Sequence, residues 1–313
     1  MLVLLDLSAA FDTIDHDLLL DMLCNQLGIR DTALKWFRSY LTQRTQRVCI
    51  NNVSSGKHPL SYGVPQGSVL GPVLFTAYTK PLHHILQDIN FHLYANDTQL
   101  YLAFNPRNQN SVNSAVSKIE ECFLRVKAWM SSYFLKLNDA KTEILLISPP
   151  NLSSRLQGIN LQLGATSVSP ARNVRDLGVI WDSSMNFEQH VTTVCKSAYF
   201  QLHNIYRIRK YLTTDATKSL VHAFITSRLD YCNGLLHGIP AYLIDRLQRI
   251  QNAAARLITG TPRSSHITPV LFELHWLPVS HRIHYKLALL TFKALNNMSP
   301  AYLTELLTVY VPS

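Results

Sequence analysis

A short turn, Tyr94-Ala95-Asn96-Asp97, separates two stretches of sequence that have the composition of β-strands. The stretches on either side, residues 89–93 and 98–102, are rich in β-branched, aromatic or alternating apolar residues. Asparagine and aspartate favour tight turns, so the segment predicts a β-hairpin whose tip carries a carboxylate. An acidic hairpin tip is common by itself. A function can be inferred for it only together with other segments of the chain.

Two segments upstream give the hairpin its context. Residues 1–5 form a short apolar strand that ends in an acid, Asp6. Residues 63–72 form a loop punctuated by glycine and proline, which leads into an apolar helix. Carboxylates on a strand end and on a neighbouring hairpin can hold two Mg²⁺ ions about 3.5–4 Å apart. The three segments together therefore predict a two-metal site.

The positive charge of the chain is concentrated in its second half. Residues 1–150 contain 13 Lys and Arg against 12 Asp and Glu, whereas residues 151–313 contain 16 against 8. A basic half of this kind favours a polyanionic partner such as nucleic acid. Solubility alone is the other explanation for such a charge excess.

Cysteines and apolar runs indicate the compartment. The five cysteines are scattered and form no Cys-x-x-Cys pair, which is typical of reduced thiols rather than of a zinc site or a disulfide framework. No apolar run is long enough to span a bilayer, and no targeting signal is visible. The sequence therefore predicts an intracellular protein, in the nucleus or the cytoplasm, with no membrane partner.

Hydrophobic periodicity predicts an α+β first part, residues 1–186, and an all-helical second part, residues 187–313. In the first part, Asp15 is placed to cap a helix. Further helices are expected over residues 69–86 and 111–134.

Several segments resemble a known family. Residues 6–16, 63–75 and 94–98 closely resemble three successive motifs of the reverse transcriptases of non-LTR (LINE-type) retrotransposons. Further similar segments extend this resemblance over almost the whole chain: residues 135–143, 176–179, 247–257 and 275–278.

The resemblance implies a fold and an activity. The fold would be a right-hand polymerase palm (residues 1–186), an antiparallel sheet backed by helices, followed by a helical thumb-like region (residues 187–313). The activity would be RNA-directed DNA polymerisation with two Mg²⁺ ions. The partners would be an RNA template, a DNA primer and deoxynucleoside triphosphates.

The resemblance also assigns roles to the acidic residues and to one lysine. Asp6 would bind metal, with the Leu7 carbonyl nearby, and the hairpin residues Asn96 and Asp97 would face the same ions. Lys141 would protonate the pyrophosphate leaving group as a general acid. Taken alone, each acid is also explained as a turn or cap residue, and the lysine as a solvated side chain.

Other positions would contact the substrates. Phe11 would be a steric gate beneath the incoming sugar, although a core aromatic residue explains it better from the sequence alone. Nucleotide and template would lie against the loop residues Gln66, Gly67 and Ser68. The primer strand would be gripped by a hairpin formed by Leu177, Gly178 and Val179.

Basic residues of the helical part are spaced so that they can follow a phosphate backbone. They are Arg207, Arg209, Lys210, Arg246, Arg249 and Arg256. Basic residues near the end of a helix also complement its dipole, which is the alternative explanation.

Two departures from the family pattern predict a weakened enzyme. The family has an aspartate where this chain has Asn96, which removes one negative charge from a site that faces two divalent ions. The chain also begins at the first acidic motif, so the fingers and any endonuclease are expected to be missing from this sequence, as in a truncated copy of a mobile element. A non-catalytic nucleic-acid-binding remnant is the alternative function.

Overall fold

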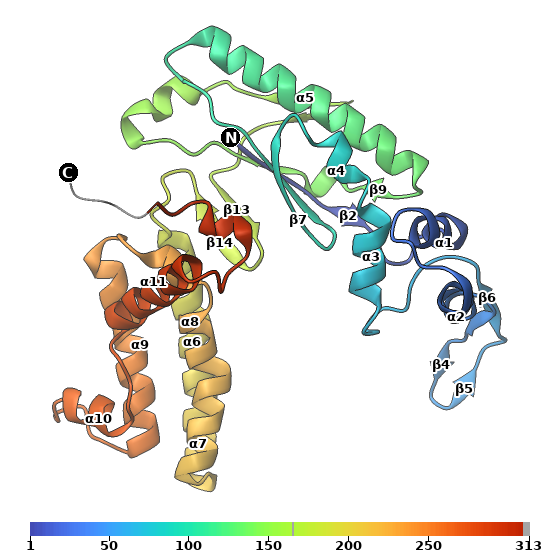
Figure 1. The fold of residues 1–313 in the computed structure, drawn as a ribbon. Helices are drawn as coiled ribbons and strands as arrows, with labels where there is room; N and C mark the ends of the chain where they lie inside the picture. Colours follow the sequence, from blue (N-terminus) through green and yellow to red (C-terminus); the bar gives the residue numbers. More distant parts are fainter. Residues whose placement is uncertain (165, 309–313) are drawn as a thin grey trace. The chain divides into compact units, whose positions relative to one another are not determined.

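The computed structural model describes residues 1–164 and 166–308 (Figure 1). The chain divides into two compact units, Met1–Val174 and a second that begins at Arg175. The first mixes strands and helices and the second is mainly helical, so the α+β prediction is confirmed. Within the described ranges, no helix is both long enough and apolar enough to cross a membrane.

A four-stranded antiparallel sheet forms the centre of the first unit, with the strand order β10-β1-β8-β7. Its strands are β1 (Leu2–Leu5), β7 (Asn90–Tyr94), β8 (Asp97–Tyr101) and β10 (Glu143–Leu145). Val3 of β1 pairs with Ile144 on one side and with Leu100 on the other. All three side chains are fully buried, so one apolar row crosses these strands and fixes their register.

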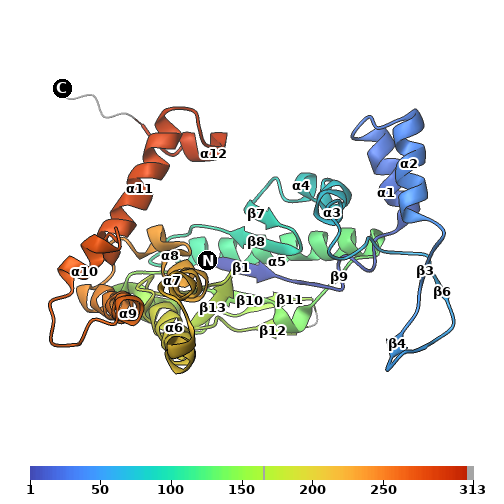
Figure 2. The same cartoon turned by 90° about the horizontal axis from the view of Figure 1, so that it is seen from below.

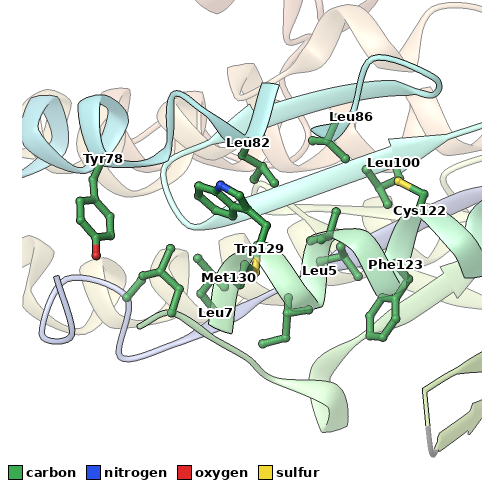
Figure 3. Packing of buried hydrophobic residues seen from close by; sticks show 14 of the residues in the cluster. Leu5, Leu7, Tyr78, Leu82, Leu86, Leu100, Cys122, Phe123, Trp129 and Met130 are labelled. Carbon is green, nitrogen blue, oxygen red and sulfur yellow. The ribbon is translucent and has the colours of Figure 1, made fainter. Parts of the chain in front are cut away.

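Helix α5 (Gln109–Ser132) covers the apolar face of this sheet (Figures 1 and 2). Its buried residues, among them Ile119, Phe123 and Val126, recur at helical spacing and join the same core as Val3 and Leu5. Figure 3 shows this core at the point where side chains from β1, β8, α4 and α5 converge. The helix therefore holds the sheet that carries Asp6.

Shorter elements complete the first unit. They are α1 (His16–Asn25), α2 (Asp31–Leu41), β2 (Leu7–Ser8) paired with β9 (Lys136–Leu137), β3 (Arg44–Gln46) paired with β6 (His58–Leu60), β4 (Cys49–Ile50) paired with β5 (Val53–Ser54), β11 (Leu161–Leu163) paired with β12 (Thr166–Val168), and the 3₁₀ turns η1 (Asp139–Lys141) and η2 (Pro150–Leu156). The backbone N–H of Leu18 donates to Asp15 Oδ1 at 2.9 Å, so the predicted cap of α1 is confirmed.

The single helix predicted over residues 69–86 is wrong. The structure has two helices there, α3 (Gly71–Thr79) and α4 (Leu82–Ile85), with Pro81 immediately before α4. Proline has no N–H for the helical ladder, and its ring clashes with the preceding turn. The apolar periodicity continues across this break, which is why the pattern alone suggested one helix.

Tyr78 of α3 ties three parts of the first unit together. Its hydroxyl donates to the Tyr133 carbonyl at 2.7 Å and accepts from the backbone N–H of Asp15 at 3.4 Å. Burial raises the pKa of Tyr78 to about 12, so the hydroxyl keeps its proton and can serve as a donor. Figure 3 shows this side chain at one end of the core.

The second unit contains a short hairpin and a group of helices. The hairpin is β13 (Asn173–Asp176) with β14 (Val179–Asp182). The helices are α6 (Glu188–Ile208), α7 (Thr214–Val221), a π-helical segment (His222–Thr226), α8 (Ser227–Asp230), α9 (Ala241–Thr259), α10 (Thr268–Glu273), α11 (Val279–Leu295) and α12 (Ala301–Thr304), with 3₁₀ turns η3 (Arg209–Tyr211) and η5 (Asn233–Leu236).

The compact units divide between Val174 and Arg175, earlier than the domain boundary after residue 186 that the sequence pattern suggested. The reason lies in the β14 side chains. Val179 is buried in the core of the helical unit, and the Trp181 ring lies 5.6 Å from the Phe187 ring, centroid to centroid. The hairpin therefore packs with the helices that follow it.

Gly63 lies against the segment that leads into α1. Its N–H donates to the Ile14 carbonyl at 2.8 Å, and its carbonyl lies 2.8 Å from His16 Nε2. The residue has a φ of +86°, and a Cβ there would lie 3.0 Å from the Asp12 backbone. Only glycine fits both the backbone conformation and the close approach.

We therefore expect Gly63→Ala to lower the free energy of unfolding by about 2 kcal/mol, since it combines a left-handed backbone with a backbone clash. Urea denaturation measures this loss. Gly56→Ala is the matched control: the φ of Gly56 lies outside the left-handed region and its Cβ position has open space around it, so the effect should stay within about 0.5 kcal/mol. Equal losses in the two variants would contradict this account.

Candidate active site

Asp6 directly follows β1 and lies beside the hairpin tip. The antiparallel register pairs Leu5 with Thr98, so the next positions outward are Asp6 and Asp97. The Asp6 backbone carbonyl accepts a hydrogen bond from the Asn138 N–H at 2.9 Å. Its side chain is 21% exposed, so the carboxylate is accessible but partly shielded from water.

Asn96 points at this carboxylate. The β7–β8 hairpin pairs Tyr94 with Asp97 across a two-residue turn, and Ala95 takes a φ of +52° at its first position. A positive φ at this position is typical of the turns that match strand twist. The turn directs the Asn96 amide inward, and its Nδ2 donates to Asp6 Oδ1 at 3.2 Å.

Lys141 contacts the other oxygen of the same carboxylate. Its Nζ donates to Asp6 Oδ2 at 3.0 Å, while the lysine side chain is 68% exposed. The residue ends the η1 turn, which an ion pair from α5, Lys127 Nζ to Asp139 Oδ2 at 2.7 Å, ties to the helix. Sequence reasoning missed this pair, because nothing separates Lys127 from the other polar residues of α5.

Asp6, Asn96, Asp97 and Lys141 form the acidic cluster of this site. Within it, the pKa of the Asp97 carboxyl is raised. Burial raises the pKa of the Asp97 carboxyl above its ordinary value of 3.8, the neighbouring Asp6 carboxylate raises it further, and Lys141 partly offsets both effects. The ionised form of Asp97 is therefore disfavoured in the folded protein.

These groups do not fit a pair of divalent cations. Asp6 and Asp97 are carboxylates, but one neighbour is a neutral amide and the other is an ammonium that already pairs with Asp6 Oδ2. The amide presents a nitrogen donor to Asp6, whereas a metal needs an oxygen lone pair. In the part of the chain that the structure describes, no cluster of three or more His, Cys, Asp or Glu is arranged to hold a metal ion.

The three loop residues predicted to contact nucleotide and template, Gln66, Gly67 and Ser68, have different surroundings. The Ser68 hydroxyl donates to the Pro65 carbonyl at 2.7 Å and accepts from the Gly71 N–H at 3.0 Å, so it stabilises the start of α3. Gln66 and Gly67 are exposed, and Gly67 has a φ of +77°. Both remain accessible to a ligand.

Phe11 is in contact with the core. Its ring lies 4.9 Å from the Phe75 ring, centroid to centroid, and it packs at the edge of the core of the first unit. This contact accounts for an aromatic residue at the position without a ligand. The steric-gate role of Phe11 stays a prediction.

The predicted primer-grip residues form the tip of the β13–β14 hairpin in the second unit. Leu177 and Gly178 occupy its turn, with φ values of +43° and +83°. The Tyr231 hydroxyl donates to the Leu177 carbonyl at 2.6 Å, and a Cβ on Gly178 would lie 3.3 Å from the Tyr231 ring. Sequence reasoning missed Tyr231, which lies far away in sequence and braces the turn from α8.

The arginines predicted to contact the phosphate backbone of nucleic acid differ in their hydrogen-bond partners within the protein. The Arg209 guanidinium donates to three carbonyls, those of Leu212, Leu257 and Ile258, at 2.9–3.0 Å. Arg256 likewise donates to the carbonyls of Pro262 and Ser265. These two side chains are engaged within the fold, so the helix-end explanation applies to Arg209.

The other basic residues predicted to contact phosphate do not use their side chains in such carbonyl contacts. Lys210 Nζ lies 4.8 Å from the centroid of the Tyr211 ring, and Arg207 is exposed. Arg246 and Arg249 of α9 line a cavity together with residues of α6. The phosphate-binding role of all these residues stays a prediction.

Comparison with known proteins identifies the family. The family described as reverse transcriptase (RNA-dependent DNA polymerase) matches residues 1–187. This match covers more than half of the chain, and the chain therefore belongs to the reverse transcriptase family.

Curated relatives agree with the resemblance to non-LTR elements. The chain is 27% identical over 283 residues to the probable RNA-directed DNA polymerase from transposon BS of Drosophila melanogaster, covering 83% of this chain and 29% of that protein. It is 24% identical over 278 residues to the RNA-directed DNA polymerase from mobile element jockey of the same species, covering 82% and 28%. The chain thus spans less than a third of the length of these relatives.

Solved structures of telomerases are similar to this chain at a low level. One, from Candida albicans in complex with a TWJ fragment of telomeric RNA, has a TM-score of 0.40 and 12% identity, and the match covers 88% of this chain and 51% of that one. Another, apo telomerase from Candida tropicalis, has a TM-score of 0.41 and 11% identity, with 83% and 42% coverage.

The raised pKa of Asp97 predicts how stability depends on pH. An acid whose pKa is higher in the folded state contributes most stability when protonated, and this contribution is lost as the pH rises above 3.8. Asp97→Asn should therefore increase the free energy of unfolding at pH 7, with a gain that shrinks as the pH falls toward 4.

Urea denaturation at several pH values measures this gain. Asp12→Asn is the control, since Asp12 is exposed and its side chain makes no hydrogen bond to any described residue. A loss of stability in Asp97→Asn at pH 7 would show that the Asp97 carboxylate is favourably paired and would contradict the assignment.

Proposed function

We propose that residues 1–186 are the palm of a reverse transcriptase and that residues 187–313 form its thumb-like region. The reaction of such a palm is RNA-templated DNA synthesis, in which a deoxynucleoside triphosphate is added to a DNA primer paired with an RNA template. Family membership and the antiparallel sheet that bears Asp6 and Asp97 at one end support this proposal.

The proposal gives the residues of the cluster separate roles. The residues that would face Mg²⁺ in an intact palm are Asp6 and Asp97, with the Leu7 carbonyl, but in this chain they do not fit a pair of these ions. Lys141 would donate a proton to pyrophosphate from its exposed position beside Asp6. Accessible Gln66 and Gly67 would line the nucleotide pocket together with Ser68, and Phe11 would lie under the sugar.

The same proposal holds that catalysis is impaired in this chain. The observation that carries it is the hydrogen bond from the Asn96 amide to Asp6 Oδ1. The Asp6 carboxylate is already satisfied by an amide and an ammonium, so a cation must displace Lys141 and meets only one further carboxylate, Asp97. Coulomb attraction to a divalent ion scales with the ligand charge, so affinity falls with the loss of the aspartate.

We expect Asn96→Asp to bind Mg²⁺ at least about 10-fold more tightly than the unchanged chain, because it adds a carboxylate facing Asp6. A ligand that binds only the folded state raises its stability, so thermal unfolding at increasing Mg²⁺ measures the affinity. Asn90→Asp is the matched control, since it adds the same charge at the exposed far end of the same hairpin. Equal Mg²⁺ stabilisation of the unchanged chain and Asn96→Asp would show that Asn96 does not weaken the site.

Primer extension tests the activity itself. With Mg²⁺ and a primed RNA template, Asn96→Asp should extend the primer, and adding Asp6→Ala should abolish the extension. The unchanged chain should extend it at least about 100-fold more slowly, since even indirect ligand changes cost about 10–100-fold. Fast extension by the unchanged chain, lost on Asp6→Ala, would refute the proposed impairment.

A further inference from the structure

A basic groove runs between α6 and α9 in the second unit. These helices pack against each other and lie side by side in Figure 1. Two cavities open along their junction, one of about 320 Å³ and one of about 1070 Å³. Both are lined by Tyr199 and Arg249, so the two cavities adjoin each other, and together they are called the groove here.

The walls of this groove come from matching rows on the two helices. The α6 row is Lys196, Tyr199, His203 and Tyr206, and the α9 row is Arg246, Arg249, Ala253 and Arg256. Both rows follow the i, i+3, i+7, i+10 spacing that places side chains on one helix face. Each helix therefore turns one continuous stripe toward the groove, and buried Leu202 lies between them.

The lining is strongly and uniformly positive. Its cationic residues are Lys196, Arg209, Arg246, Arg249, Arg256 and Arg263. Neither cavity is lined by an aspartate or a glutamate. A concave surface that gathers charge of one sign attracts a ligand of the opposite charge.

Two of these six cations make hydrogen bonds within the fold, and the side chains of the other four do not. Arg209 and Arg256 use their N–H groups on backbone carbonyls, which stabilises the helix ends and the loop after α9. The side chains of four others form no hydrogen bond and no ion pair with any residue in the described part of the chain: Lys196, Arg246, Arg249 and Arg263. These four retain their donors for a ligand.

Two tyrosines add flat aromatic surface to the same stripe. Tyr199 and Tyr206 are 47% and 71% exposed, and they lie two helical turns apart, about 10 Å along α6. Exposed tyrosine rings beside free arginines offer stacking surfaces and phosphate contacts together. A ligand with only negative charge would use the cations and leave the rings uncovered.

From these observations we propose that the groove between α6 and α9 binds single-stranded nucleic acid. Phosphates contact Lys196, Arg246, Arg249 and Arg263, and unpaired bases stack on Tyr199 and Tyr206. Paired bases hide their faces in a duplex, so the tyrosines select single strands. This binding does not require the proposed polymerase activity, because every residue involved lies in the second unit.

The test uses the full chain and a short labelled single-stranded RNA of mixed sequence, with EDTA present and no nucleoside triphosphate. Fluorescence anisotropy gives the Kd. The double variant Tyr199→Leu/Tyr206→Leu should weaken binding by about 5- to 150-fold for each ring removed and leave its salt dependence unchanged. Arg249→Gln should weaken binding and lower the slope of log K against log salt by about 0.7.

Matched controls come from α11 in the same unit. Tyr285→Leu removes a tyrosine that is 60% exposed and lies outside the groove, and Lys293→Gln removes an exposed cation there. Both should bind RNA as the unchanged chain does. Single-stranded DNA should also bind, since it offers the same phosphates and base faces, whereas duplex RNA should bind more weakly.

Three results would overturn the proposal. The first is an unchanged Kd for RNA in the double tyrosine variant. The second is duplex RNA that binds as tightly as single-stranded RNA or more tightly. The third is heparin that binds as tightly as RNA, with an affinity that the tyrosine substitutions do not change. Extension by Asn96→Asp without groove binding would refute only this inference, and groove binding without any extension would leave it standing while the proposed function fails.

Discussion

The antiparallel pairing of β1 with β8 is the interaction on which the candidate site depends. The buried row of Ile144, Val3 and Leu100 fixes its register, and that register brings Asp6 next to Asp97. A slip by one residue would turn Val3 out of the core and carry Asp6 away from the hairpin tip. The geometry of the acids is therefore a consequence of core packing and needs no ligand to maintain it.

With the register fixed, charge determines the behaviour of the cluster. Burial raises the pKa of Asp97, and repulsion between the two neighbouring carboxylates, Asp6 and Asp97, raises it further. An aspartate at position 96 would add a third carboxylate, which bound cations would have to compensate. Asn96 removes that repulsion and donates a hydrogen bond to Asp6. The same residue that is proposed to weaken cation binding would thus make the cluster more stable without cations, a trade between stability and activity.

The sequence predicted the features that depend on local pattern. The Asp15 cap and the meeting of Asp6 with the hairpin follow from residue type, strand pattern and turn chemistry. Features that depend on tertiary packing could not be predicted from the sequence pattern. The hairpin of β13 and β14 packs with later helices, and the carbonyl contacts of Arg209 come from a helix about 50 residues further on. Pro81 separates α3 from α4 although the apolar periodicity continues across it, so local backbone chemistry decides where the helix ends.

The two candidate sites differ in how they respond to sequence change. Metal binding needs several full charges at one point, so a single residue such as Asn96 decides it. The groove between α6 and α9 spreads its cations and rings over two helical rows, and each contact contributes only part of the affinity. Its scaffold is also secured separately, since the Arg209 and Arg256 contacts hold the helix ends whether or not a ligand is present. A substitution that alters the charge of the acidic cluster would therefore leave intact, on physical grounds, the surface that we propose to hold a nucleic-acid strand.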